Sequence, residues 1–471
     1  MSARVSWAVG VAAAIAVGLA LSALALAPDP AAERSAALYV PAVAAVTLVS
    51  LAYVVWRVHP AYTLSAAIFL TPFAGNWPQL GIPGPLSPDR LLLAGAIVAV
   101  VLRAPPIASR PPLRLPGIQW FLGLAVAYVL GSALVAGTLT ERPAFFKIVD
   151  AFGILPFLTF LVAPVVFATR RYRAVLLGTL VALGAYLGLT TLFETARVDS
   201  LVFPRYILDP AYGIHAGRGR GPFVDAVANG LALYTCAVAC AVALATWRRP
   251  SHRILAAGVG LLCLVGTFLC LQRSVWIGAA LGTAVAMVAT RGARRYLLPV
   301  VVATTIGILV ATALVPGLSE RVTGRVQQGE TLWDRENLAR AAVNMIEARP
   351  LLGFGWGRFT RESADYFEQA PGYPLTSTAS PVHNTPLGYG AELGLIGLTL
   401  WLLALLCGVG AALAPRGPPD LILWRAALLA VATALLVVIN AVPPTAWPNR
   451  SLWLLAGVAY SGRYALRESA A

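Results

Sequence analysis

Runs of apolar residues, most of them close to the length that crosses a bilayer, recur along nearly the whole chain and are separated by short polar stretches. A spanning helix needs about 20 predominantly apolar residues, whereas strands of a membrane barrel would alternate apolar and polar positions. The pattern therefore predicts an all-α, polytopic transmembrane helix bundle of about 12–14 spans. We place the spans at residues 7–27, 37–56, 61–74, 90–102, 117–137, 146–167, 173–194, 226–247, 254–271, 274–290, 296–316, 385–413, 421–442 and 451–465.

The arginines of the connecting segments fall in alternate loops. Short loops that cross the membrane avoid Arg and Lys, and the arginine-bearing loops include "WRVHP", "TRRYR", "WRRPSHR" and "TRGARRY". With these loops inside, both termini are predicted to be cytoplasmic. Residues 7–27 end like a signal peptide, but the apolar run is longer than that of a signal peptide and only Arg4 precedes it as a basic residue. We therefore interpret residues 7–27 as the first span.

The composition excludes several functional classes. The chain of 471 residues is 59% hydrophobic, and its net charge of +15 is dispersed over loops, which is typical of topology signals and not of a nucleic-acid surface. Lys147 is the only lysine, which excludes a Walker-type phosphate loop. The sequence contains no Asp-x-Asp pair, which is the simplest motif that holds a metal–nucleotide complex. All 5 cysteines lie in apolar runs, and we interpret them as packing residues. We expect no metal, no cofactor and no nucleic acid.

Three segments predicted to lie outside hold arginine against the insertion bias. The first contains "HAGRGRGPF", the second is the turn "LQRSVW", and the third is a long polar loop. The chain is thereby divided into four predicted regions: N-terminal spans in 1–195, spans with arginine-bearing outer loops in 196–316, an extracytoplasmic loop in 317–384, and C-terminal spans in 385–471.

Part of the long loop, "TLWDRENLARAAVNMIEARP", has the pattern of an amphipathic helix. We place Thr331 as its N-cap, Asp334 in the capping-box position and Pro350 just beyond its end. One stripe of the helix is apolar and also holds Arg335. It consists of Leu338, Ala339, Ala342, Met345 and Ile346, and Arg340, Asn344 and Glu347 face the other way. An arginine on a packed face is costly unless an anion meets it.

After this helix, "RPLLGFGWGRF" holds Gly353, Gly355 and Gly357. Glycines in this spacing allow either a tight turn or a close approach of the backbone to a ligand, and both interpretations stay open.

Four residues far apart in sequence are predicted at the outer face: Arg220, Arg273, Arg335 and His383. Together they would form a cationic pocket with one titratable base, which suits a diphosphate because arginine forks bind phosphate oxygens bidentately.

Each candidate also has an ordinary structural interpretation. Arg273 could extend to lipid headgroups from a helix end, and Arg335 could pair with a loop carboxylate. Arg220 could be plain loop charge, and His383 could cap the following helix or bond a backbone carbonyl. Glu392 could be a structural partner for an arginine, although a carboxylate within a span is always a functional candidate.

The motifs around these residues resemble those of the O-antigen ligase and O-antigen polymerase superfamily. "HNTPLGYGAELGLIG" resembles the family signature of His, then Asn, Ser or Gln, and a later Gly-x-x-Gly, represented here by His383, Asn384, Gly394 and Gly397. "RPLLGFGWGRF", "LQRSVWIG" and "RGRGPFVDAVANG" are similar to three further motifs. The resemblance covers roughly residues 200–400, and the ligases have about twelve spans where we count about fourteen.

The resemblance implies a glycosyltransferase that uses a polyprenyl diphosphate-linked glycan in place of a nucleotide sugar and faces the periplasm from the bacterial inner membrane. It implies that Arg273, Arg335 and, less directly, Arg220 bind the lipid diphosphate and that His383 acts on the acceptor. Asn384, Gly355 and Glu392 are expected to help bind substrate.

The acceptor is either lipid A core, as for a ligase, or another carrier-linked glycan, as for a polymerase. A transporter of the lipid-linked glycan is the alternative from another class. His215 is expected to matter little, because it lies in a Gly-rich loop without a fixed helix to orient it.

Overall fold

The computed structural model describes residues 57–82, 87–102, 117–290, 292–315, 317–327, 330–369, 372, 380–414, 417–442 and 446–462. Within these ranges the chain is helical and contains no β-strand, which confirms the predicted all-α class. The predicted spans at 7–27 and 37–56 lie outside the described residues. Each of the other predicted spans coincides with a helix.

The chain divides into two compact units, Met1–Arg110 with Arg171–Thr179, and Pro111–Arg170 with Leu180–Ala471. In the first unit, α3 (Pro60–Leu70) packs against α4 (Pro88–Leu102). The indole N–H of Trp77 donates to Oδ1 of buried Asp89 (2.9 Å) in the same unit.

The second unit holds all the candidate site residues. Its N-terminal part comprises α5 (Gly117–Val135), α6 (Arg142–Phe146), the π-helical segment η4 (Lys147–Phe152), α7 (Ile154–Val166), most of α8 (Arg170–Ala196), α9 (Ala226–Thr246), α10 (Pro250–Leu269), α11 (Arg273–Ala289) and α12 (Leu297–Leu314). The remainder comprises α13 (Leu318–Gln327), α14 (Glu330–Ala348), α15 (Phe359–Glu362), the 3₁₀ turn η9 (Ser363–Tyr366), α16 (Thr385–Leu413), α17 (Leu421–Val438) and α18 (Ala446–Tyr460).

Seven of the described helical segments are long and apolar enough to cross a membrane. They are Arg142–Val166, Arg170–Ala196, Ala226–Thr246, Pro250–Leu269, Arg294–Leu314, Thr385–Leu413 and Leu421–Val438. Two further apolar helices, Trp120–Val135 and Arg273–Ala289, are shorter. The protein is therefore a multi-pass membrane protein.

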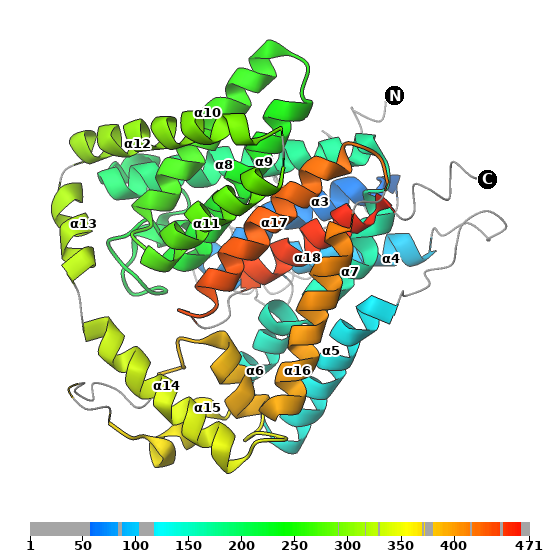
Figure 1. Ribbon diagram of the computed structural model, residues 1–471, viewed down its shortest axis with the longest axis vertical. Helices are drawn as coiled ribbons and strands as arrows, with labels where there is room; N and C mark the ends of the chain where they lie inside the picture. The colour runs from blue at the N-terminus through cyan, green and yellow to red at the C-terminus, as the bar shows by residue number, and fades with distance from the viewer. Residues whose placement is uncertain are drawn as a thin grey trace, which may run out of the picture. The chain divides into compact units, whose positions relative to one another are not determined.

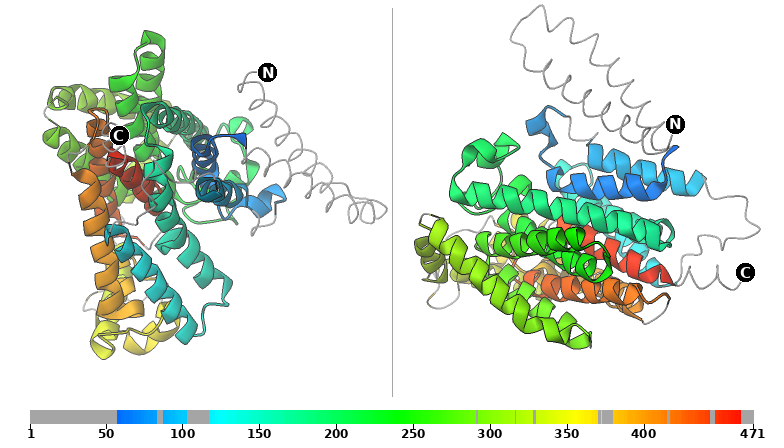
Figure 2. Two further views of the ribbon diagram at one scale, coloured as in Figure 1. Left: turned by 90° about the vertical axis from the view of Figure 1, so that its right-hand side faces the viewer. Right: turned by 90° about the horizontal axis from the view of Figure 1, so that it is seen from above.

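The long loop folds against one end of the spanning helices. In Figure 1, α14 and α15 lie at the lower end of α16 and α5, and the left view of Figure 2 shows the same yellow segments gathered at one end of orange α16. Leu338, Met345, Phe359 and Val382 form a small buried core there, which joins the loop to the start of α16. This core fixes the loop relative to the signature segment.

The predicted loop helix exists, with two corrections. It begins at Glu330, so Thr331 lies inside it and the predicted N-cap is wrong, whereas its end at Ala348 before Pro350 is as predicted. Ala341 is fully buried, whereas Ala339 on the predicted stripe is only partly buried. The buried face is shifted because α14 packs against both α16 and η9. Arg340 is exposed, as predicted.

α16 is interrupted at Gly394, whose backbone (φ 65°, ψ −175°) is not helical. The break leaves carbonyl groups of α16 without their helical hydrogen bonds, and the glycine-rich turn 353–357 supplies donors to them. The N–H groups of Phe354 and Gly355 donate to the carbonyls of Ala391 (3.0 Å) and Glu392 (2.8 Å), and the Tyr128 hydroxyl donates to the Leu393 carbonyl (2.9 Å). The turn is thus docked into the break of α16.

Glycine is required on both sides of this contact. A Cβ on Gly353 would lie 2.6 Å from the backbone of Glu392, and one on Gly394 would collide with the carbonyl of Leu351. Gly355 has φ 103°, and a Cβ there would lie 2.6 Å from Ala136. The backbone geometry of the turn therefore explains why residue 355 is glycine, as the tight-turn interpretation predicts.

We expect Gly394→Ala to destabilise the protein by about 2–4 kcal/mol, because it combines a left-handed φ with overlap against backbone. Gly410→Ala is the matched control in the same helix, since nothing lies within 4 Å of the added methyl group. The control should be neutral or stabilising by about 0.5–1 kcal/mol. Thermal unfolding in detergent measures both variants, and equal stability would contradict the docking of the turn.

Candidate active site

His383 lies on the short segment that connects the long loop to α16. Asn384, and not His383, caps the helix, because its Oδ1 accepts from the N–H of Leu387 (3.0 Å). The Nδ1 atom of His383 is buried and has no hydrogen-bond partner among the described residues. The helix-cap interpretation of His383 is therefore wrong, whereas the other ordinary interpretation, a hydrogen bond to backbone, is supported at Pro381.

The electrostatic neighbours of His383 come from three parts of the chain. Burial lowers the pKa of His383 below the usual 6.5, and the electrostatic effects of Arg335 and His215 lower it further. Asp334 and a backbone hydrogen bond at Pro381 act in the opposite direction. The loop helix thus brings Arg335 beside the histidine, and the imidazole is held in its neutral form.

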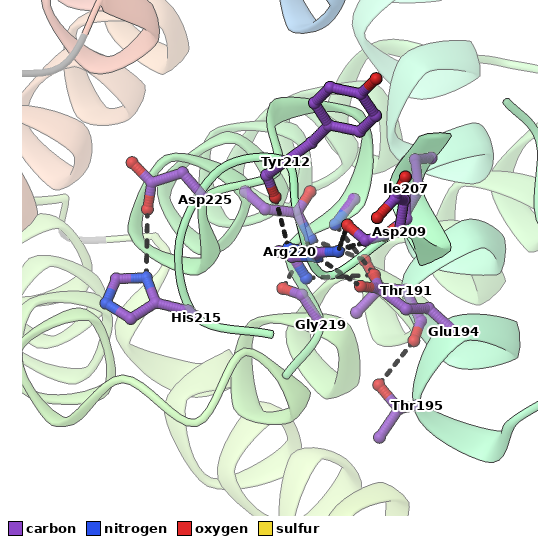
Figure 3. Close-up of polar contacts among 12 residues, drawn as sticks. Thr191, Glu194, Thr195, Ile207, Asp209, Tyr212, His215, Gly219, Arg220 and Asp225 are labelled. Atoms are coloured by element: carbon purple, nitrogen blue, oxygen red, sulfur yellow. Dashed lines mark hydrogen bonds and ion pairs between the residues drawn. The ribbon is translucent and has the colours of Figure 1, made fainter. Parts of the chain in front are cut away.

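His215 lies close to the start of α9. Its Nδ1 lies 3.6 Å from Oδ1 of Asp225, which also caps α9 by accepting from the N–H of Val227 (2.8 Å) (Figure 3). The Ile214 N–H donates to the Val224 carbonyl (2.9 Å), which closes the loop on which the histidine sits. The distance to Asp225 is too long for a hydrogen bond, so the expectation that His215 matters little stays a prediction.

Arg220 is buried and bonded to the protein. Its guanidinium donates to the carbonyls of Ile207, Asp209 and Tyr212, and its Nε lies 3.7 Å from the Glu194 carboxylate (Figure 3). The side chain is 2% exposed, so the interpretation as plain loop charge is wrong. Four of its five N–H groups are used in this way, which favours an anchoring role over a phosphate contact.

The Arg220 loop also holds the turn that leads to Arg273. The Gly219 N–H donates to the Leu269 carbonyl (3.2 Å) at the end of α10, and the Asn229 amide donates to the Gly219 carbonyl (3.0 Å) and approaches Cys270 Sγ (3.7 Å). Arg273 begins α11 and is half-buried. It is not among the groups that shift the pKa of His383.

A cavity of about 260 Å³ lies on the other side of the signature segment. Asn384 and Glu392 line it, together with Lys147 from η4 and Arg361 from α15. Lys147 Nζ is 4.0 Å from Oε2 of Glu392 and 4.9 Å from the centre of the Trp356 ring. Glu392 therefore pairs with a lysine and not with an arginine.

Two comparisons with known proteins bear on this arrangement. Residues 258–402 match the O-antigen ligase family model. A comparison with curated proteins gives no match. The predicted family resemblance is confirmed for the matched segment, which lies in a multi-pass membrane protein.

The O-antigen ligase segment contains Arg273, Arg335, His383 and Glu392. Arg220 and Lys147 lie outside it. The sequence analysis included the Arg220 motif in the resemblance, but the family match does not extend to it. The role of Arg220 is therefore argued from its contacts in the structure alone.

Sequence reasoning missed Lys147 as a candidate. A lone lysine at the start of an otherwise apolar span was the available signal, because ionisable groups in such segments are rare and often functional. Among the described residues, no group of three or more His, Cys, Asp or Glu side chains could hold a metal ion.

Proposed function

We propose that the protein transfers a glycan from a polyprenyl diphosphate carrier to an acceptor hydroxyl at the outer face of the cytoplasmic membrane. The observation that carries this proposal is the buried imidazole of His383, whose pKa is lowered by burial and by Arg335, inside the O-antigen ligase segment. The His383 imidazole is a base that is held in its neutral form, and the Arg335 guanidinium is suited to bidentate binding of phosphate oxygens.

In the proposed reaction, His383 accepts the proton of the acceptor hydroxyl while the hydroxyl oxygen attacks the anomeric carbon. The bond from that carbon to the diphosphate breaks, its electron pair stays on the diphosphate, and the configuration inverts. Arg335 and Arg273 stabilise the charge that develops on the leaving diphosphate. The diphosphate also offsets the field of Arg335 at His383, so the pKa of the histidine rises when the donor is bound, and the histidine becomes a better base.

A ligase and a polymerase share this chemistry and differ in the acceptor. A ligase uses lipid A core, and a polymerase uses a second carrier-linked glycan. Transport of the lipid-linked glycan is the weaker alternative, because His383 and Arg335 lie outside the seven candidate spans, whereas transporters place such groups near the membrane midplane.

The proposal is tested with purified protein in vesicles, a polyprenyl diphosphate glycan, and each acceptor in turn, without nucleotide and with a metal chelator. We expect glycan transfer, and the acceptor that is modified separates ligase from polymerase. Movement of the glycan across the vesicle membrane without transfer to either acceptor would support the transporter.

The proposed orientation places both termini in the cytoplasm and the long loop outside. Gln369 and Arg249 are both exposed and lie in predicted outer and inner segments, respectively. A cysteine at position 369 should react with an impermeant thiol reagent added outside intact cells, and one at position 249 should not.

A further inference from the structure

The cavity beside Asn384 has the features of a built binding site. Its walls come from α6 and η4, from α15 with the preceding turn, and from the first turns of α16. Thr360 and Arg361 are exposed at its edge, so the cavity opens to the surface. Pro381, Val382 and Asn384 line it, whereas His383 itself and Arg335 do not. It therefore adjoins the proposed reaction centre and is distinct from it.

Glu392 presents an unsatisfied acceptor in this cavity. The residue is 4% exposed, and its Oε1 accepts from the Phe359 N–H (3.3 Å). Oε2 has no hydrogen-bond partner among the described residues, because Lys147 Nζ at 4.0 Å is too distant for a hydrogen bond. A buried oxygen without a donor is costly, so a ligand hydroxyl that reached Oε2 would be bound favourably.

The charges in the cavity select against a phosphate group. Lys147 and Arg361 are balanced by Glu392 and Glu141, and Arg361 is already bonded to both oxygens of Glu141 (2.8 and 3.1 Å). The balanced lining offers no net positive charge to a diphosphate, which disfavours the donor, whose sugar is bonded directly to the diphosphate. The buried rings of Phe359 and Tyr389 complete the lining with apolar surface, which suits a molecule with hydroxyl groups around an apolar ring.

We propose that this cavity binds a neutral sugar unit of the acceptor glycan. Glu392 accepts from its hydroxyl groups, and Lys147 donates to its oxygens. The volume of about 260 Å³ is near the lower end of ligand pockets, at roughly 300 Å³, and so fits one sugar and not an oligosaccharide. Bound there, the sugar fixes the acceptor next to His383. This assignment of an acceptor subsite rests on the proposed transferase function.

Binding is measured first without any reaction, with methyl glycosides of neutral hexoses and heptoses as probes and tryptophan fluorescence as the signal. We expect at least one methyl glycoside to bind to the wild type. Glu392→Gln, which keeps the shape but removes the charge, should weaken that binding about tenfold. Thr360→Trp, at the exposed edge, should block the cavity without altering the core. Glu347→Gln, on the exposed face of α14, is the matched control and should bind as the wild type does.

Transfer kinetics then separate this proposal from the one on which it rests. Glu392→Gln and Thr360→Trp should raise the KM for acceptor and leave the KM for donor unchanged. Specific glycoside binding by a protein that transfers nothing would retain the sugar site and reject the transferase function. Normal transfer by the wild type, with an altered donor KM or unaltered kinetics in both variants, would overturn the acceptor subsite.

Discussion

Replacing Arg335 with alanine is expected to reduce glycan transfer by about 100- to 1,000-fold, the range found when one donor to a developing oxyanion is removed. Arg335 lies on the loop helix α14, and its charge already acts on His383. Arg335→Lys should also be poor, because an ammonium group does not reproduce the bidentate fork. The measurement is kcat/KM for donor in vesicles, with the amount of folded protein in the membrane determined in parallel.

Arg340→Ala is the matched control for this prediction. Arg340 lies on the exposed face of the same helix and pairs with Glu336, 3.3 Å away and four residues earlier. Such an exposed pair contributes little to stability, so the variant should transfer glycan almost normally. Equal losses in Arg335→Ala and Arg340→Ala would mean that the helix fold, and not the guanidinium, is what transfer requires.

Replacing His383 with alanine is expected to lower kcat by about 100- to 10,000-fold, the usual contribution of a general base. Binding of the donor should be retained, because Arg335 and Arg273 remain. Single-turnover kinetics with saturating donor separate the two effects. If His383→Ala weakens donor binding and retains turnover, the histidine is a phosphate contact and the base is another group.

The pH profile gives a second and independent test of His383. Because the pKa of the free enzyme's histidine is lowered, the imidazole stays neutral to below pH 6.5, and kcat/KM should fall only below that pH. The pKa rises in the donor complex if a diphosphate offsets Arg335, so the acid limb of kcat should lie at higher pH than that of kcat/KM. His215→Gln removes one of the groups that lower this pKa electrostatically, and so should move the acid limb of kcat/KM upward while leaving turnover near neutral pH largely intact.

Burial in lipid made most of the fold predictable. A spanning helix leaves a long apolar run in the sequence, and for this reason the helices α5, α8 to α12, α16 and α17 begin and end close to the predicted limits. The start of α14 was less predictable, because a helix that packs on two sides continues beyond its best capping residue.

The contacts of the site were less predictable than its members. Sequence placed Arg335 and His383 on the same side of the membrane, but their proximity depends on the packing of Leu338 and Met345 against Val382. The environment of Arg220 was hidden because its main acceptors are backbone carbonyls, which any sequence provides. Lys147 and Glu392 are 245 positions apart and belong to different helical segments, so no local pattern joins them.

The break in α16 also constrains how this protein matures during synthesis. The turn 353–357 leaves the ribosome before residues 391–396, to which it bonds, so it emerges with its hydrogen-bonding partners not yet made. Until α16 has entered the bilayer, His383 and Arg335 have no fixed positions relative to each other. On the proposed function, a nascent chain that stalls before this insertion would be inactive in glycan transfer, because the turn and its partners in α16 would not yet be joined.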